Sequence, residues 1–298
     1  MVNSVKYLKQ INYCFFFCVI IKVVIIMAKN EFDKDIKYRL YRTVKELLHP
    51  TISKKNISEY KIIIKDDLLP LYVYYPKKVS TMEKVLIYIH GDSKITECEN
   101  SYPEICNKLA INTDSIVMAI DYPKMKKNFI NIYTEIYNTV KHINSELNEL
   151  NKNIKIVLAG DSTGCNIING INYLNKKEIN ITKEIFFYPV LNTKKIIAPA
   201  EHELFNPNLL LDIENYFKSI ADNNDLTSDI LNYNGNMPNT LIVIGNIDPL
   251  KSVVEDYSKN NKNIQYTEIA FASHGFLKKA DKEAEIDTYN AVNKFIKE

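Results

Sequence analysis

Residues 154–176 read IKIVLAGDSTGCNIINGINYLNK, and this stretch decides the fold that we expect for the chain. The apolar run 154–159 has the length and composition of a buried strand, and the segment 163–176 repeats apolar residues at helical spacing. Between them, Gly160-Asp161-Ser162-Thr163-Gly164 forms a G-x-S-x-G motif, which is typical of a sharp strand-to-helix turn. Such a turn strains the serine backbone and exposes the hydroxyl, so Ser162 is a candidate nucleophile.

The motif carries more information here than in an average protein because glycine is rare. The chain has only 7 glycines in 298 residues, and a G-x-S-x-G match is expected by chance roughly 0.008 times. A plain turn between a strand and a helix is the competing interpretation. The strand-like and helix-like flanks both agree with a nucleophile elbow, and we prefer that interpretation.

Segments of the same two kinds alternate along the rest of the chain, which predicts an α/β fold with a mostly parallel sheet flanked by helices. Besides 154–159, the expected strands are 84–89, 115–120, 184–188, 240–245 and 263–269. The expected helices lie near 102–111, 130–150, 163–176, 251–260 and 280–297. Unbroken apolar runs in these strands are typical of a sheet covered on both faces. A hairpin of 57–65 and 70–75, with its turn at Asp66-Asp67, precedes them.

Composition excludes several classes of partner. The net charge is only +2 and the chain has two arginines, Arg39 and Arg42, so nothing indicates binding to nucleic acid. The cysteines are odd in number and have neither a disulfide nor a metal-binding spacing. They are Cys14, Cys18, Cys98, Cys106 and Cys165. Reduced thiols are therefore favoured, which indicates a reducing compartment.

The N-terminal segment 1–28 is hydrophobic, and residues 11–28 (INYCFFFCVIIKVVIIMA) are long enough to cross a membrane. One interpretation is a membrane anchor, because Lys22 costs less than the surrounding Ile, Val and Phe contribute to insertion. Cationic residues after the segment would then keep the remaining domain, 29–298, in the cytoplasm. The other interpretation is that the natural chain starts at Met27 and has no anchor. Both interpretations place the domain in the cytoplasm, and only the first associates it with a membrane.

Two further polar residues follow the ends of expected strands, where α/β proteins place their chemistry. Asp248 lies after 240–245, in Gly-Asn-Ile-Asp-Pro-Leu, and His274 lies after the last strand, in Phe-Ala-Ser-His-Gly-Phe. Asp248 could instead cap the next helix, with Pro249 at the first helical position. The chain order Ser, Asp, His distinguishes one triad fold from the others. It favours His274 as general base and Asp248 as the residue that orients it.

Five motifs in order resemble those of the hormone-sensitive-lipase-like branch of the α/β hydrolases, which includes many microbial acetyl and carboxyl esterases. They are His90-Gly91, Asp121-Tyr122-Pro123, the G-D-S-x-G elbow, Asp248-Pro249-Leu250 and His274-Gly275-Phe276. The resemblance runs from about residue 34 to the end of the chain. It implies the α/β-hydrolase fold and a small helical cap, formed by about 32–60 and 195–235.

The resemblance also implies an oxyanion hole, built from backbone N–H groups of Gly91, Asp92, Ser93 and Thr163. The family normally has glycine at the positions of Asp92 and Ser93, and Cys165 also replaces a usual glycine. Backbone donors do not depend on side-chain identity, and Asp tolerates left-handed backbone geometry. A carboxylate close to a developing oxyanion nevertheless opposes it unless the carboxylate is paired or turned away.

The sequence therefore predicts a serine hydrolase that cleaves small carboxylic esters through an acyl-enzyme, with no metal and no organic cofactor. Two alternatives remain open. One is an amidase or peptidase on the same triad, which the sequence separates poorly from an esterase. The other is a catalytically inactive ligand-binding homologue. Asp92 is the main argument for this last alternative, and retention of all three triad residues argues against it.

Overall fold

The structure of the chain is a computed structural model that describes part of its residues. The described residues are 60–62, 68–76, 83–91, 102–122, 129–191, 233, 235, 237–278 and 281–298. The hydrophobic segment 11–28 lies outside them, as do the expected cap segments 32–60 and 195–235 apart from a few residues at their ends. Among the described residues, none of the helices has the length and apolar character needed to span a membrane.

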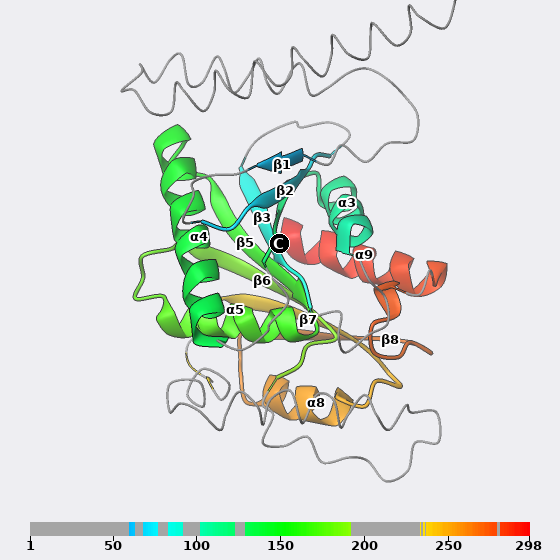
Figure 1. Ribbon diagram of the computed structural model, residues 1–298. Helices are drawn as coiled ribbons and strands as arrows, with labels where there is room; N and C mark the ends of the chain where they lie inside the picture. Colours follow the sequence, from blue (N-terminus) through cyan, green and yellow to red (C-terminus); the bar gives the residue numbers. More distant parts are fainter. Residues whose placement is uncertain are drawn as a thin grey trace, which may run out of the picture. The chain divides into compact units, whose positions relative to one another are not determined.

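An eight-stranded sheet in the order β1-β2-β4-β3-β5-β6-β7-β8 forms the centre of the described structure (Figure 1). All neighbours from β4 to β8 are parallel, whereas β2 pairs antiparallel with both β1 and β4. The first four strands are β1 (Tyr60–Ile62), β2 (Leu71–Tyr74), β3 (Lys84–Ile89) and β4 (Ile116–Ile120). The last four are β5 (Lys155–Asp161), β6 (Ile181–Phe187), β7 (Asn239–Gly245) and β8 (Ile264–Ile269). The expected mostly parallel sheet and its leading antiparallel pair are thus confirmed.

Helices flank the sheet on both sides, as expected for an α/β fold. In Figure 1, α3 (Tyr102–Thr113) and α9 (Lys282–Lys297) lie on one side, and α4 (Phe129–Leu150) and α5 (Thr163–Leu174) on the other. The remaining elements are α8 (Lys251–Lys259), which packs along β8, and the short 3-10 turn η2 (Phe276–Lys278). Every helix expected within the described residues is present, with its ends shifted by at most two residues.

One strand boundary differs from the sequence expectation. β6 begins at Ile181, three residues before the expected start at Glu184. The first three residues of β6 are only partly buried, and Thr182 and Lys183 among them are polar. Because these positions are partly exposed, they can hold polar residues, and the start of β6 therefore lacks the unbroken apolar run on which the expectation was based. Its backbone still pairs with β5.

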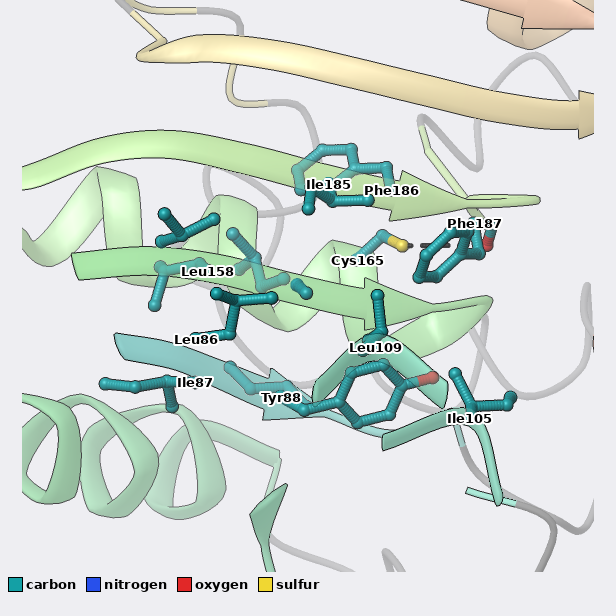
Figure 2. Close-up of a cluster of buried hydrophobic side chains, with 14 of the residues drawn as sticks. Leu86, Ile87, Tyr88, Ile105, Leu109, Leu158, Cys165, Ile185, Phe186 and Phe187 are labelled. Atoms are coloured by element: carbon teal, nitrogen blue, oxygen red, sulfur yellow. Dashed lines mark hydrogen bonds between the residues drawn. The ribbon is translucent and has the colours of Figure 1, made fainter. Parts of the chain in front are cut away.

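The core explains why the strands are apolar on both faces. β3 is buried from Val85 to Ile89, with helices on both sides of the sheet. Figure 2 shows how side chains of β3, β5 and β6 gather with those of α3 and with Cys165 of α5. Each large apolar side chain that is fully buried contributes roughly 1.5–3 kcal/mol to folding. Cys106 and Cys165 are buried in this core and neither forms a disulfide.

Glu184 is a carboxyl group buried within this core. Asn172 Nδ2 donates to its Oε1 over 2.8 Å, and Thr240 Oγ1 lies 3.2 Å from its Oε2. Thr240 Oγ1 also lies 2.9 Å from the Pro238 carbonyl, and a hydroxyl has only one proton to donate. If that proton goes to Pro238, the contact with Glu184 requires a proton on the carboxyl. Consistent with this, burial raises the pKa of Glu184 to about 8.

We therefore expect the Glu184→Gln variant to gain stability over the wild type as the pH rises. The unfolded glutamate loses its proton near its ordinary pKa of about 4.3, whereas the folded one keeps it to about pH 8. Wild-type stability should fall across this window, because the folded state binds more protons there. Urea unfolding should show the variant gaining at least about 1 kcal/mol on the wild type between about pH 5 and about pH 8. Glu146→Gln, at an exposed position of α4, is the control, and equal pH dependence in all three proteins would contradict a neutral Glu184.

Candidate active site

Ser162 lies at the turn between β5 and α5 with a strained backbone. Its φ of 51° and ψ of −120° place it in a region that non-glycine residues rarely occupy, at a cost of about 1–3 kcal/mol. Two hydrogen bonds of 3.0 Å hold the turn, from Ser162 N–H to the Phe187 carbonyl and from Val190 N–H to the Ser162 carbonyl. The end of β6 and the residues directly after it thus hold Ser162 in its strained conformation.

The two motif glycines are required because β3 passes close behind the turn. A Cβ atom on Gly164 would lie 2.1 Å from the Ile89 carbonyl oxygen and 2.8 Å from that of His90. On Gly160 it would lie 2.8 Å from the same Ile89 oxygen. The interpretation of the motif as a nucleophile elbow therefore agrees with the packing that the structure shows at both positions.

Ser162, His274 and Asp248 meet in a buried chain of hydrogen bonds. Ser162 Oγ lies 3.0 Å from His274 Nε2, and His274 Nδ1 lies 3.0 Å from Asp248 Oδ2. All three residues are at most 5% exposed. A carboxylate only accepts, so Nδ1 donates to Asp248, and Nε2 is left to accept the Ser162 hydroxyl proton. The structure thus brings together three residues that the sequence places on separate loops.

Asp248 also organises the loop that follows β7. Its second carboxylate oxygen, Oδ1, accepts the Leu250 N–H over 2.9 Å. The helix α8 begins at Lys251, after Leu250, so Asp248 is not its N-cap and Pro249 is not its first residue. The N-cap interpretation of Asp248 is therefore wrong, and the carboxylate instead holds a turn with one oxygen and contacts His274 with the other.

The loops of Asp248 and His274 are packed against each other at Gly245. A Cβ on Gly245 would lie 1.9 Å from the Ala272 carbonyl oxygen, so only glycine fits at the end of β7. The same Ala272 oxygen accepts the Ile247 N–H over 3.2 Å. This close approach sets the distance between the two loops, and with it the distance between the imidazole and the carboxylate.

Tyr188 is a site residue that the sequence did not reveal. It follows β6 with a φ of 36°, and its ring packs edge-on against His274 with 5.2 Å between centroids. Phe276 contacts the same ring at 5.3 Å. Burial raises the pKa of Tyr188 well above its usual value, so the phenol is neutral beside the imidazole. The pair Tyr188-Pro189 directly after an apolar strand was the only signal that could have indicated it.

Of the four expected oxyanion donors, the described residues include only Gly91 and Thr163. Thr163 is the first residue of α5, directly after Ser162, so its N–H lies at a helix N-terminus. Asp92 and Ser93 lie outside the described residues. Gly91 requires a correction, because its N–H donates to Asp161 Oδ1 over 2.9 Å. Its N–H is therefore engaged by the protein itself and anchors the loop.

Asp161, the residue before the nucleophile, is fully buried. Its Oδ1 accepts the Tyr88 hydroxyl over 2.8 Å in addition to the Gly91 N–H, and its Oδ2 pairs with Lys278 Nζ at 2.9 Å. Burial alone would raise the pKa of Asp161. The charge and hydrogen bond of Lys278, with the Gly91 N–H and Tyr88, outweigh burial and hold the pKa below its usual value. The carboxyl is therefore ionised.

His90 lies at the start of the loop after β3 and is not a member of the triad. Its ring is stacked between Tyr102 and Tyr122, with centroids 4.7 and 4.2 Å away. Burial lowers the pKa of His90, which favours a neutral imidazole at this position. Of the other histidines, His142 lies on α4, 3.8 Å from Glu146, and His49 and His202 fall outside the described residues. In the described part of the chain, no three His, Cys, Asp or Glu side chains are grouped to hold a metal ion.

Comparison with known proteins agrees with this geometry. A profile of the α/β-hydrolase fold family matches residues 86–278, which is more than half of the chain and includes every member of the triad. The chain belongs to the α/β-hydrolase fold family. The family that the five sequence motifs indicated, and the α/β-hydrolase fold that they implied, are thereby confirmed. A search of curated proteins finds no match to the chain.

Solved structures of several esterases superpose on the chain at low sequence identity. An esterase of the archaeon Pyrobaculum calidifontis has a TM-score of 0.65 at 18% identity, covering 90% of this chain and 91% of its own. Carboxyl esterase 2 of the fungus Tuber melanosporum has a TM-score of 0.64 at 17% identity, covering 84% and 89%. A thermostable carboxylesterase from a metagenomic library has a TM-score of 0.61 at 21% identity, covering 89% and 98%. At identities this low the likeness establishes a shared fold.

We expect the Gly164→Ala variant of this α/β hydrolase to be strongly destabilised. The added methyl group would lie 2.1 Å from the Ile89 carbonyl oxygen, and β3 has no flexible side chain there to yield. Overpacking of this kind costs about 1–3 kcal/mol or more. Thermal unfolding would measure the loss against Ser162→Ala, which adds no atom to the same turn. Equal unfolding temperatures for the two variants would contradict the close approach of β3 to the elbow.

Proposed function

We propose that the chain is a serine hydrolase that cleaves small carboxylic esters through Ser162, His274 and Asp248. The observation that carries the proposal is the buried chain of two 3.0 Å contacts from a serine with a φ of 51° through a histidine to a carboxylate. A nucleophile, a base and an orienting acid are the parts that acyl transfer needs. Membership of the α/β-hydrolase family and the names of the superposed esterases support the same chemistry.

The proposed reaction has two halves. Ser162 Oγ attacks the ester carbonyl while His274 Nε2 takes its proton, and Asp248 stabilises the imidazolium through Nδ1–H. The imidazolium then protonates the leaving alcohol, and the acyl group stays on Oγ. Water attacks this acyl-enzyme, His274 takes one proton from it, and the same proton returns to Oγ as the carboxylic acid leaves. The Tyr188 ring, packed edge-on against His274, keeps the imidazole in place during both halves.

For the oxyanion we propose the N–H of Thr163 together with loop N–H groups at Asp92 and Ser93. Thr163 begins α5, so the partial positive charge of the helix N-terminus lies where negative charge develops on the carbonyl oxygen. Gly91 is left out of this set because Asp161 accepts its N–H. We assign Gly91 instead to anchoring the loop that carries the other two donors.

Ser162→Ala should abolish ester turnover without unfolding the protein. Removing a triad nucleophile lowers kcat by about 10³-fold or more, because the acyl-enzyme can then no longer form on Oγ. Hydrolysis of p-nitrophenyl esters from acetate to octanoate would measure the loss and size the acyl pocket. Ser115→Ala is a matched control, since Ser115 is also a buried serine but donates to the Thr113 carbonyl. Turnover that survives in Ser162→Ala would refute the assignment.

Asp248→Asn should lower kcat by about 10²- to 10⁴-fold with a smaller change in KM. The asparagine amide group can donate to His274 Nδ1, and this stabilises the tautomer whose Nε2 carries a proton and cannot accept one from Ser162. Asp281→Asn is the control, because Asp281 caps α9 and asparagine is also a good cap. A kcat for Asp248→Asn close to the wild-type value would exclude the proposed role of Asp248.

The same assays separate the two alternatives from the esterase. A p-nitroanilide of the best acyl group, hydrolysed at least as well as the matched ester, would favour an amidase or peptidase. A catalytically inactive binding protein would turn over neither substrate and would leave an active-site phosphonate unreacted at Ser162. Rescue of turnover by Asp92→Gly would assign such inactivity to the loop carboxylate and restore the hydrolase interpretation.

A further inference from the structure

Lys278 brings a buried cation to the nucleophile elbow. It is the last residue of η2 and lies four residues after His274, on the same loop. Its Nζ is 2.9 Å from Asp161 Oδ2, and the two side chains are 6% and 0% exposed. The pair therefore connects the histidine loop with the residue that precedes Ser162.

The second oxygen of Asp161 extends this connection to a third loop. Asp161 Oδ1 accepts the N–H of Gly91, which follows β3, and the hydroxyl of Tyr88 within β3. Gly91 is closely packed there, since a Cβ on it would lie 2.9 Å from the Asp161 carbonyl oxygen and 3.0 Å from Ser162 Cβ. One carboxylate thus joins the loop of Gly91, the elbow and the histidine loop.

The charge of Asp161 makes its pairing important for chemistry as well as for packing. A carboxylate directly before the nucleophile would oppose the negative charge that develops during attack, unless a cation neutralises it. Without a cationic partner, a carboxylate in this buried position would either take up a proton or force the groups around it to rearrange. Rearrangement would disturb the hydrogen bond from Gly91 N–H directly. Protonation would weaken it, because a neutral carboxyl is a poorer acceptor than a carboxylate.

We propose that Lys278 is a positioning residue of the hydrolase, which neutralises Asp161 and thereby keeps the Gly91 loop and the histidine loop aligned with Ser162. The inference rests on the proposed function, because ester hydrolysis at Ser162 is the reaction that Lys278 supports. Lys278 acts through Asp161 and not on the substrate. The H-G-F motif does not contain this position, so the sequence offered no reason to single it out.

The test compares four variants of the full chain with the wild type. Lys278→Met removes the charge and keeps an unbranched apolar chain, and Lys278→Arg keeps the charge. The double variant Asp161→Asn, Lys278→Met removes both charges and retains an oxygen that can accept from Gly91. Lys108→Met is the matched control, because it breaks a pair with Glu285 of 2.6 Å that joins α3 to α9.

We expect Lys278→Met to lower kcat for p-nitrophenyl acetate by about 10- to 100-fold, less than the about 10²- to 10³-fold lost with a direct oxyanion donor. KM should change by less than about threefold, since uniform substrate binding is not affected. Lys278→Arg and the double variant should recover most of this kcat, as expected for two coupled residues. Lys108→Met should leave kcat unchanged even where it lowers the unfolding temperature.

Amide exchange of Gly91 N–H provides a readout that does not need turnover. Exchange should be faster in Lys278→Met than in the wild type, and Lys108→Met should leave it unchanged, because only the first variant weakens the acceptor. If Lys278→Met does not fold, the kcat of the double variant tests the proposal instead. A folded double variant with a kcat close to wild type supports the proposal, and a folded but inactive one overturns it.

Failure of the proposal can be told apart from failure of the proposed function. If the wild type hydrolyses the ester through Ser162, an unchanged kcat in Lys278→Met overturns only the role of Lys278. A double variant whose kcat is as low as that of Lys278→Met also overturns only the role of Lys278. If the wild type shows no Ser162-dependent turnover, the proposed function fails. Gly91 exchange then decides alone, and equal exchange in Lys278→Met and the wild type overturns the positioning role.

Discussion

Asp161 has a carboxylate with no access to solvent, and the arrangement of the site depends on it. Three donors from two parts of the chain reach its two oxygens: Tyr88 and Gly91, in and directly after β3, and Lys278 of the histidine loop. In a buried position a carboxylate is stable only when its oxygens are satisfied and its charge is compensated. The loops that supply the donors are therefore constrained relative to Ser162, because moving any one of them would leave the charge partly unsatisfied.

The parallel sheet provides the frame on which this constraint acts. β3, β5, β7 and β8 run in the same direction, so the loops that follow them meet at one edge. Ser162 follows β5, Asp248 follows β7, and His274 follows β8. Two glycine contacts bring these loops to hydrogen-bonding distance: Gly164 against β3 and Gly245 against Ala272. Backbone contact of this kind tolerates no side chain, which accounts for glycine at both positions in a chain that has so few.

Much of this architecture could be predicted because it leaves a local trace in the sequence. Buried strands give unbroken apolar runs, the elbow gives G-x-S-x-G, and the triad order distinguishes one fold from others. β6 was expected to begin three residues after its actual start, at Ile181. Its first residues are only partly buried, and Thr182 and Lys183 among them interrupt the apolar pattern. Tyr188 and Lys278 were missed, since their roles depend on contacts with His274 and Asp161 that no local spacing encodes. Gly91 was predicted at the right place with the wrong partner, because the direction of one N–H is decided by a side chain 70 residues away.

The left-handed backbone of Ser162 has a consequence for how such a sequence can change over time. A residue with a φ of 51° lowers the stability of the folded chain, and most proteins retain only a small excess of stability above what function requires. Substitutions elsewhere that destabilise the sheet therefore reduce the same small excess of stability that allows the chain to fold with a strained serine. Glycine at this position would remove the strain and raise stability, so the serine hydroxyl is present at a cost to the stability of the fold.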